Sequence, residues 1–174
     1  MKNRALLVVG ICILAALASV LGHLAGAGSA RAAAGTPRNV GAYSCINFLG
    51  GHRNVPAGST IVIRSGWASG SPGAVTSFIN AQTTILSVND AHMIDVSGGY
   101  EAPHPDGAGN FVSVNTYPTG VTLANPGDSM RFTYALLLKR RVTDVYDVDG
   151  DGNRDPAHFQ PGLVFGGTCT VTAT

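Results

Sequence analysis

The sequence has few of the residues on which enzymes depend. Only 12% of its 174 residues are charged, and Glu101 is its single glutamate. Its histidines follow neither the H-x-H nor the H-x-x-x-H spacing of common zinc sites, and no G-x-S-x-G motif is present. We therefore assign no catalytic residue and expect a non-enzymatic protein. A secreted hydrolase is the last alternative, because the fold can bring distant Ser, His and Asp residues together.

Cysteine is also scarce, with three residues in the chain. Cys12 lies in an apolar N-terminal run, whereas Cys45 and Cys169 lie near opposite ends of the remainder. An even count in an exported domain favours one disulfide between Cys45 and Cys169, and two buried free thiols are the alternative. On the entropic model, closing so long a loop stabilises the fold by about 5 kcal/mol.

The N-terminal segment has the organisation of a secretory signal peptide. Lys2 and Arg4 precede an uncharged apolar run over 5–21, and small residues lead to an A-x-A site at Ala32–Ala34. We expect a signal peptide over 1–34, a single domain over 35–174 and a secreted, extracellular protein. The alternative is membrane anchoring through an uncleaved segment, because the run is near the lower length limit for spanning a bilayer.

Basic residues are too few for a nucleic-acid-binding surface. Cleavage would remove Lys2, Arg4 and Arg31, which leaves fewer basic than acidic residues. A phosphate backbone is therefore not an expected partner. A cell-surface polysaccharide or a protein is the expected class of partner, and the oligomeric state is left open.

Most of the domain has the alternating pattern of β-strands. Over 129–138 one face is wholly apolar, formed by Met130, Phe132, Tyr134, Leu136 and Leu138. Ile61 and Ile63 share one face of an earlier strand, and Asn89–Asp90 is predicted to form the turn of a hairpin. These patterns predict an all-β fold.

One segment, near 72–80, favours a short helix instead. Ser71 is a suitable N-cap and Pro72 suits the first helical turn. The apolar residues of this segment recur at helical spacing: Val75, Phe78 and Ile79.

The Pro-Gly turns that precede strands, in VPAGSTIVIR and NPGDSMRFTYALLL, resemble those of secreted immunoglobulin-like domains. This resemblance covers the β segments only and implies an antiparallel β-sandwich. A jelly roll is the alternative architecture, because the separation of the two cysteines exceeds that of the usual intersheet bridge in antibody domains.

The stretch YDVDGDGNRDP concentrates carboxylates in a weakly charged chain. It resembles the D-x-D-x-D-G calcium loops of EF-hands and dockerin-type repeats. The resemblance implies calcium ligands from the side chains or main chain of five residues: Asp147, Asp149, Asp151, Asn153 and Asp155. Gly152 permits the tight turn that wraps oxygens around a hard cation.

The loop departs from the EF-hand pattern at the twelfth position, where His158 replaces the bidentate glutamate. Its flanks are typical of strands rather than helices. We expect a structural calcium site of weak affinity, in the range of about 10⁻⁴–10⁻³ M, between two strands. A solvated acidic turn is the alternative.

Three aromatic residues are candidates for ligand binding: Trp67, Tyr100 and Tyr117. They lie in or beside predicted loops, where flat rings can stack on sugars. Secreted β-sandwiches with a structural calcium ion resemble carbohydrate-binding modules, which gives the second interpretation of function. The leading interpretation is a secreted non-enzymatic domain with a binding or structural role, one disulfide and one calcium ion.

Overall fold

The computed structural model describes residues 35–146 and 155–174. The predicted signal peptide lies outside these residues, so its prediction is not tested. The described residues belong to one compact unit. Among the described residues, no helix is both long enough and apolar enough to cross a membrane.

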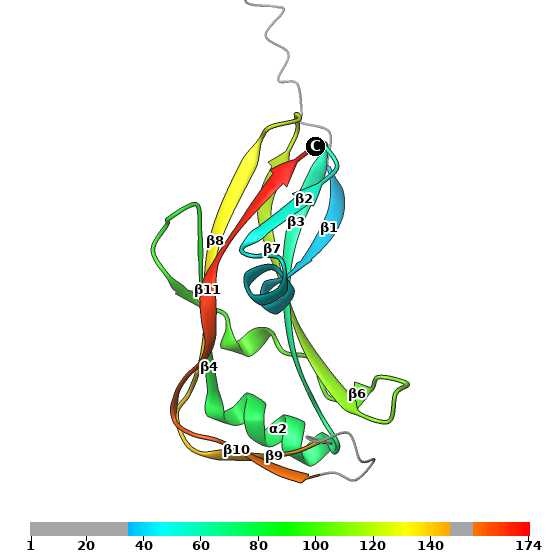
Figure 1. Ribbon diagram of the computed structural model, residues 1–174, viewed down its shortest axis with the longest axis vertical. Helices are drawn as coiled ribbons and strands as arrows, with labels where there is room; N and C mark the ends of the chain where they lie inside the picture. The colour runs from blue at the N-terminus through cyan, green and yellow to red at the C-terminus, as the bar shows by residue number, and fades with distance from the viewer. Residues whose placement is uncertain (1–34, 147–154) are drawn as a thin grey trace, which may run out of the picture. The chain divides into compact units, whose positions relative to one another are not determined.

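Two β-sheets face each other across a shared core, as Figure 1 shows. The first sheet has the order β1 (Thr36–Gly41), β3 (Ser59–Ser69), β7 (Phe111–Leu123), β6 (His104–Pro105). The second has the order β2 (His52–Val55), β11 (Gly162–Ala173), β8 (Ser129–Leu138), β4 (Gln82–Val88), β5 (Ile94–Asp95). A separate hairpin pairs β9 (Val142–Tyr146) with β10 (Asp155–Phe159).

The all-β, sandwich-like prediction is confirmed, but the sheets are mixed rather than purely antiparallel. β1 runs parallel to β3, and β2 runs parallel to β11. The π-helical turn η1 (Ser44–Phe48) lies between β1 and β2, so the chain passes from one sheet to the other there. Each sheet thus gains a short strand at one edge, which limits the exposure of unpaired backbone groups.

The predicted apolar face of β8 forms one wall of the core. Its inward side chains are all buried: Met130, Phe132, Tyr134, Leu136 and Leu138. Ile61 and Ile63 of β3 are buried in the same core, as their shared face predicted. Burial of each such aliphatic side chain stabilises the fold by about 1.5–3 kcal/mol.

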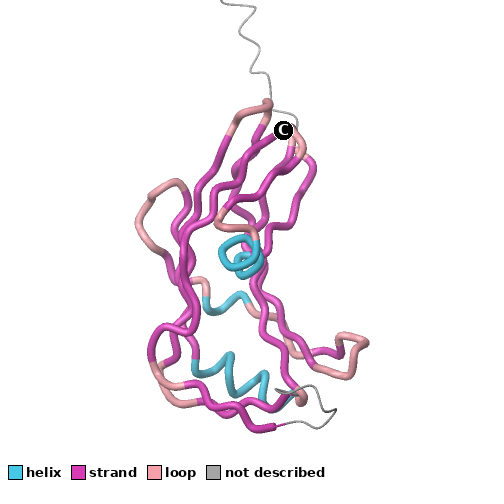
Figure 2. The backbone as a smooth tube through the Cα atoms, in the orientation of Figure 1, coloured by secondary structure: helices cyan, strands magenta, loops and turns pink. Residues whose placement is uncertain are grey.

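The predicted short helix is α2 (Pro72–Ala81), which joins β3 of the first sheet to β4 of the second. Figure 2 shows it crossing between the two sheets. Ser71 is the N-cap and accepts a 3.2 Å hydrogen bond from the Ala74 amide. Val75 and Phe78 point into the interior with no exposed surface. The helix therefore closes the space between the sheets at the point where the chain changes sheet.

The predicted hairpin turn connects β4 to β5. Asn89 and Asp90 take left-handed conformations, with φ of 51° and 59°, which Asn and Asp tolerate better than most residues. The Asn89 side chain accepts a 3.0 Å hydrogen bond from the Arg131 amide, and Asp90 forms an exposed ion pair with Arg131. The turn is thereby fixed to β8.

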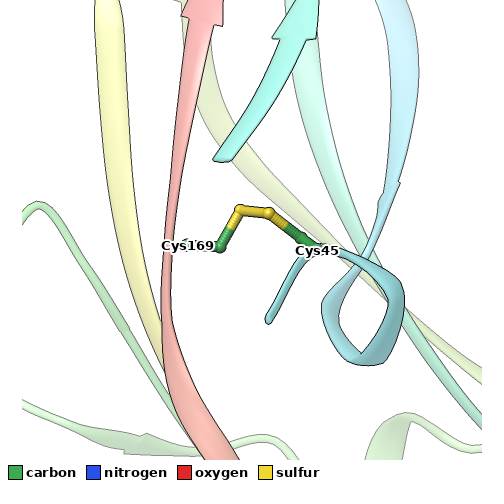
Figure 3. The surroundings of a disulfide bond; sticks show 2 residues. All are labelled: Cys45 and Cys169. Carbon is green, nitrogen blue, oxygen red and sulfur yellow. A yellow bond between two sulfur atoms is a disulfide. The ribbon is translucent and has the colours of Figure 1, made fainter. Parts of the chain in front are cut away.

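Cys45 and Cys169 form a disulfide in the structure, shown in Figure 3. The bond ties η1 to β11 across a Cα–Cα distance of 5.9 Å. Both cysteines are buried, and Ile46 of η1 lies over Gly167, where an added Cβ would meet Ile46 Cγ2 at 2.5 Å. The disulfide and this close contact fix η1 against the second sheet.

Candidate functional site

A cavity of about 400 Å³ lies between the two sheets. Its walls come from β3, β8, β10, β11 and the residue that precedes η1. Aromatic rings dominate the lining: Tyr43, Trp67, Tyr134, Phe159 and Phe165. A concave, aromatic-lined space of this size is typical of sites for small molecules.

The cavity arises from a change of side-chain size along β3. The inward positions Ile61 and Ile63 fill the space between the sheets, but the next inward position is Ser65. Because the small side chain of Ser65 lines the space that Tyr134 also lines, this space is not filled to the density of an ordinary protein core.

Trp67 is held at the cavity wall by three contacts. Its ring stacks on Phe78 of α2, with centroids 3.6 Å apart and planes at 7°, and it meets the ring of Phe159 edge-on at 5.1 Å. Its indole Nε1 donates a 2.6 Å hydrogen bond to Asp144 Oδ2. Trp67 therefore presents a fixed ring to the cavity.

Asp144 is a buried carboxylate, with 0% of its surface exposed. Besides the indole, its Oδ1 accepts a 2.7 Å hydrogen bond from the Val145 amide. Both oxygens are thus paired, as a buried polar group requires. The residue couples β9 to the cavity wall on β3.

Tyr134 lines the cavity, but its hydroxyl oxygen is buried. Its side chain is 2% exposed, and among the described residues its Oη has no hydrogen-bond partner. Burial, followed by the nearby Tyr100 phenol, raises the pKa of Tyr134 above its ordinary value. The phenol therefore stays protonated further into the alkaline range than an ordinary tyrosine.

A row of aromatic rings links this cavity to the surface. Tyr134 lies 5.5 Å from Phe165, Phe165 lies 5.1 Å from Tyr43, and Tyr43 lies 5.3 Å from Phe48 between ring centroids. Exposure increases along the row, from 2% at Tyr134 to 53% at Tyr43 and 72% at Phe48. The outer rings give the cavity an apolar rim.

The predicted calcium ligands fall almost entirely outside the described residues. Asp147, Asp149, Asp151 and Asn153 lie in 147–154, and Asp155 begins β10. Asp155 pairs with Tyr146 across the hairpin, so the two ends of the predicted loop are adjacent. The rest of the described chain holds no cluster of three or more His, Cys, Asp or Glu residues suited to a metal.

The structure describes all three candidate sugar-binding aromatics. Trp67, Tyr100 and Tyr117 are each partly buried, and Trp67 and Tyr117 pack against the core. Tyr100 instead places its hydroxyl 3.5 Å from Ser65 Oγ. Of the three, Trp67 is the one that lines the cavity.

The four histidines of the predicted mature domain are all exposed: His52, His92, His104 and His158. His104 lies 3.5 Å from Glu101, and His158 lies 3.1 Å from Thr143 Oγ1. None of them lines the cavity.

Comparisons of the chain with protein-family models, curated proteins and solved structures gave no significant match. The resemblances to calcium loops and to immunoglobulin-like domains therefore remain predictions based on the sequence.

Sequence reasoning missed most of the cavity residues. Tyr134 was correctly placed on the apolar face of β8, but nothing in that pattern separates a cavity wall from a filled core. Tyr43, Phe159 and Phe165 lie in segments with no distinctive motif. The only usable signal was the interruption of the inward apolar residues of β3 by Ser65.

Proposed function

We propose that this chain is an exported, non-catalytic binding domain that takes a small apolar molecule into the cavity between its sheets. The observation that carries the proposal is the lining of that cavity by five aromatic residues. Its volume of about 400 Å³ falls within the range of roughly 300–1,000 Å³ found for small-molecule sites. The predicted signal peptide and the disulfide support export.

The lining favours binding over catalysis. Within the described parts of the chain, no His, Cys, Asp or Glu side chain lines the cavity. A general acid or base must lie within hydrogen-bonding reach of the reacting group. The lining offers an apolar ligand much contact area and few polar groups.

Sugar binding has less support from the arrangement of the aromatics. A sugar-binding platform needs an accessible ring face together with polar groups that satisfy the sugar hydroxyls. Phe78 covers one face of the Trp67 ring, and the indole N–H is already bonded to Asp144. We therefore place polysaccharide binding second to the apolar ligand.

We also propose that calcium binds the loop between β9 and β10. The D-x-D-x-D-G spacing supports this assignment, and the Asp155–Tyr146 pairing keeps the ends of the loop together. Calcium would offset the repulsion among these aspartates. Its role would be structural, because the hairpin contributes both Asp144 and the cavity residue Phe159.

The experiment that tests the binding proposal uses the intrinsic fluorescence of Trp67, the single tryptophan of the chain. Titration with the neutral probe N-phenyl-1-naphthylamine should change the Trp67 emission in a saturable manner with one site per chain. Ser65→Leu should weaken binding of the probe, because the larger side chain occupies part of the cavity. Thr116→Leu is the matched control, because Thr116 is exposed on the neighbouring strand β7.

The proposal would be overturned if the probe gave no saturable signal with the folded protein. Equal binding by Ser65→Leu and the unmodified chain would place the probe elsewhere and would overturn it too. Circular dichroism of both variants checks that the fold is retained.

A further inference from the structure

We propose that the surface around η1 docks on an anionic lipid membrane, with its apolar side chains inserted among the lipids and two arginines on the lipid phosphates. This surface, called the η1 face below, consists of five residues: Tyr43, Phe48, Leu49, Arg53 and Arg64. The inference goes beyond the proposed ligand binding and does not depend on it. Three observations carry it: the exposed apolar side chains, the exposed arginines beside them, and the rigid support of η1.

Large apolar side chains are exposed within and beside η1. Phe48 is 72% exposed, Tyr43 is 53% exposed and Leu49 is 42% exposed. The rings of Tyr43 and Phe48 meet edge-on with their centroids 5.3 Å apart, so they form one cluster. Contiguous apolar groups on a protein surface mark sites that contact a partner or a membrane.

Two arginines lie beside these apolar side chains. Arg53 shares a surface hollow with Leu49, and Arg64 shares a second hollow with Tyr43. Ser44 lines both hollows, so the two adjoin each other. Both arginines are exposed, and neither forms an ion pair within the described parts of the chain. Their charges are therefore open to an external anion.

The segments that build the η1 face contain no negative charge. All ten Asp and Glu residues of the chain lie between positions 90 and 155, whereas β1, η1, β2 and β3 all end before position 70. Of the described residues, no Asp or Glu lines either hollow. A fringe of positive charge around exposed rings is complementary to an anionic bilayer, which attracts basic residues near its surface.

A membrane accounts for this surface better than a protein partner does. A stable protein interface buries about 800 Å² on each partner, whereas the apolar part of the η1 face is formed by Tyr43, Phe48 and Leu49 alone. Membrane docking requires a shallow insertion of apolar groups, strengthened by attraction between basic residues and anionic lipids. Aromatic rings are also enriched at the boundary between water and the lipid interior.

The support beneath η1 holds the apolar side chains in place. The Cys45–Cys169 disulfide ties η1 to β11, and Ile46 lies closely over Gly167. Because η1 is already fixed, docking does not have to order a flexible loop, which would weaken binding.

The other concentration of positive charge, Lys139–Arg141, lacks such a cluster. The two residues that flank it, Leu138 and Val142, are both buried. This loop therefore offers charge without apolar groups to insert, and it serves as an internal comparison for the η1 face.

The test measures how much protein sediments with vesicles made of equal parts phosphatidylglycerol and phosphatidylcholine. The unmodified protein should bind these vesicles, and binding should weaken as salt is added, because salt screens the attraction between the arginines and the lipids. Vesicles of phosphatidylcholine alone should bind the protein more weakly, because they offer no net negative charge.

Substitutions in the η1 face should lower the vesicle partition coefficient. Phe48→Ser should lower it about tenfold, the effect of removing one inserted apolar side chain. Arg53→Gln and Arg64→Gln should each lower it about fivefold. Met93→Ser and Arg140→Gln are the matched controls and should leave it nearly unchanged. Met93 is 53% exposed next to β5, at the edge of the second sheet opposite β2, and Arg140 is exposed between β8 and β9.

Absence of binding to the anionic vesicles, or equal binding by Phe48→Ser and the unmodified protein, would refute membrane docking. A larger loss in Arg140→Gln than in Arg53→Gln would place the docking surface at the 139–141 loop and would refute it too. If sedimentation velocity showed a dimer that Phe48→Ser dissociates, the η1 face would be an interface between two copies of the chain instead. Circular dichroism of all variants checks that the fold is retained.

Discussion

The indole N–H of Trp67 donates a 2.6 Å hydrogen bond to the carboxylate of Asp144, which lies 77 positions away and has no exposed surface. The contact joins the cavity wall on β3 to the β9–β10 hairpin. In the sequence, Asp144 lies just before the aspartate-rich loop and cannot be told apart from the predicted calcium ligands. In the fold its two carboxylate oxygens accept hydrogen bonds from Trp67 and the Val145 amide instead.

Removing this carboxylate should weaken the fold. Asp144→Ala leaves the Trp67 N–H without its acceptor, and we expect a loss of about 1–3 kcal/mol in the free energy of unfolding. Chemical denaturation measures the loss. Asp90→Ala, which removes an exposed partner of Arg131, is the control and should cost no more than about 1 kcal/mol. Equal losses in the two variants would contradict a structural role for the Trp67–Asp144 bond.

Loss of the disulfide should destabilise the domain more strongly. Cys45 and Cys169 are separated by 124 positions, and removal of a native disulfide from a small secreted domain typically costs about 2–5 kcal/mol. Thermal unfolding with and without reductant measures the effect. The double variant Cys45→Ser/Cys169→Ser should unfold at the same temperature whether or not reductant is present. If reductant still lowered the unfolding temperature of the double variant, the effect could not be assigned to the Cys45–Cys169 bond.

The N-cap of α2 can be tested by a single substitution. Ser71→Ala removes the oxygen that accepts from the Ala74 amide and should cost about 1 kcal/mol of stability. Ser71→Asn supplies another capping oxygen and should restore most of that loss. Urea denaturation of both variants provides the comparison, and equal stabilities would show that the cap contributes little.

Calcium should stabilise the domain through the loop between β9 and β10. For a dissociation constant of about 10⁻⁴–10⁻³ M, about 10 mM calcium should add about 1–3 kcal/mol. Differential scanning calorimetry should show the rise in melting temperature, and Asp149→Ala should remove it. Asp106→Ala, at a carboxylate bonded within its own turn, is the control. An unchanged melting temperature at millimolar calcium would remove the site from consideration.

The Tyr134 phenol should make stability fall at alkaline pH. Burial raises the pKa of this group above its ordinary value of about 10. Its contribution is therefore present below the pKa of the unfolded chain and is lost as pH rises through the folded-state pKa. Denaturation measured from about pH 9 upward should show a smaller loss for Tyr134→Phe than for the unmodified chain. A loss of the same size in Tyr134→Phe would assign the effect to other groups.

Local patterns in the sequence predicted the elements of the fold well. The alternation over β8, the shared face of Ile61 and Ile63, and the Ser71–Pro72 start of α2 all describe interactions between near neighbours in the chain. The parallel pairings of β1 with β3 and of β2 with β11 were not predicted. They depend on how the chain passes from one sheet to the other, which residue periodicity does not encode.

The candidate site was less predictable, because it too depends on contacts between segments that are far apart in the sequence. A cavity forms between two facing surfaces. The small size of Ser65 therefore indicates a cavity only when it is known that Tyr134, from the other sheet, lines the same space. The burial of Asp144 likewise depends on Trp67, which belongs to a distant segment. The sequence identified Trp67 as a candidate ligand-binding residue, but it did not predict that Phe78 and Phe159 pack against its ring.

The first strand begins, and the last strand ends, beside the same turn. The Thr36 amide donates to the Gly58 carbonyl, and the Thr174 amide donates to the Val55 carbonyl, so both ends of the described domain lie along 55–58. A short linker from Thr174 to Gly35 can therefore close the domain into a ring. Reopening that ring within the exposed turn 89–93 should yield a circular permutant with the same fold, because neither joint disturbs a strand.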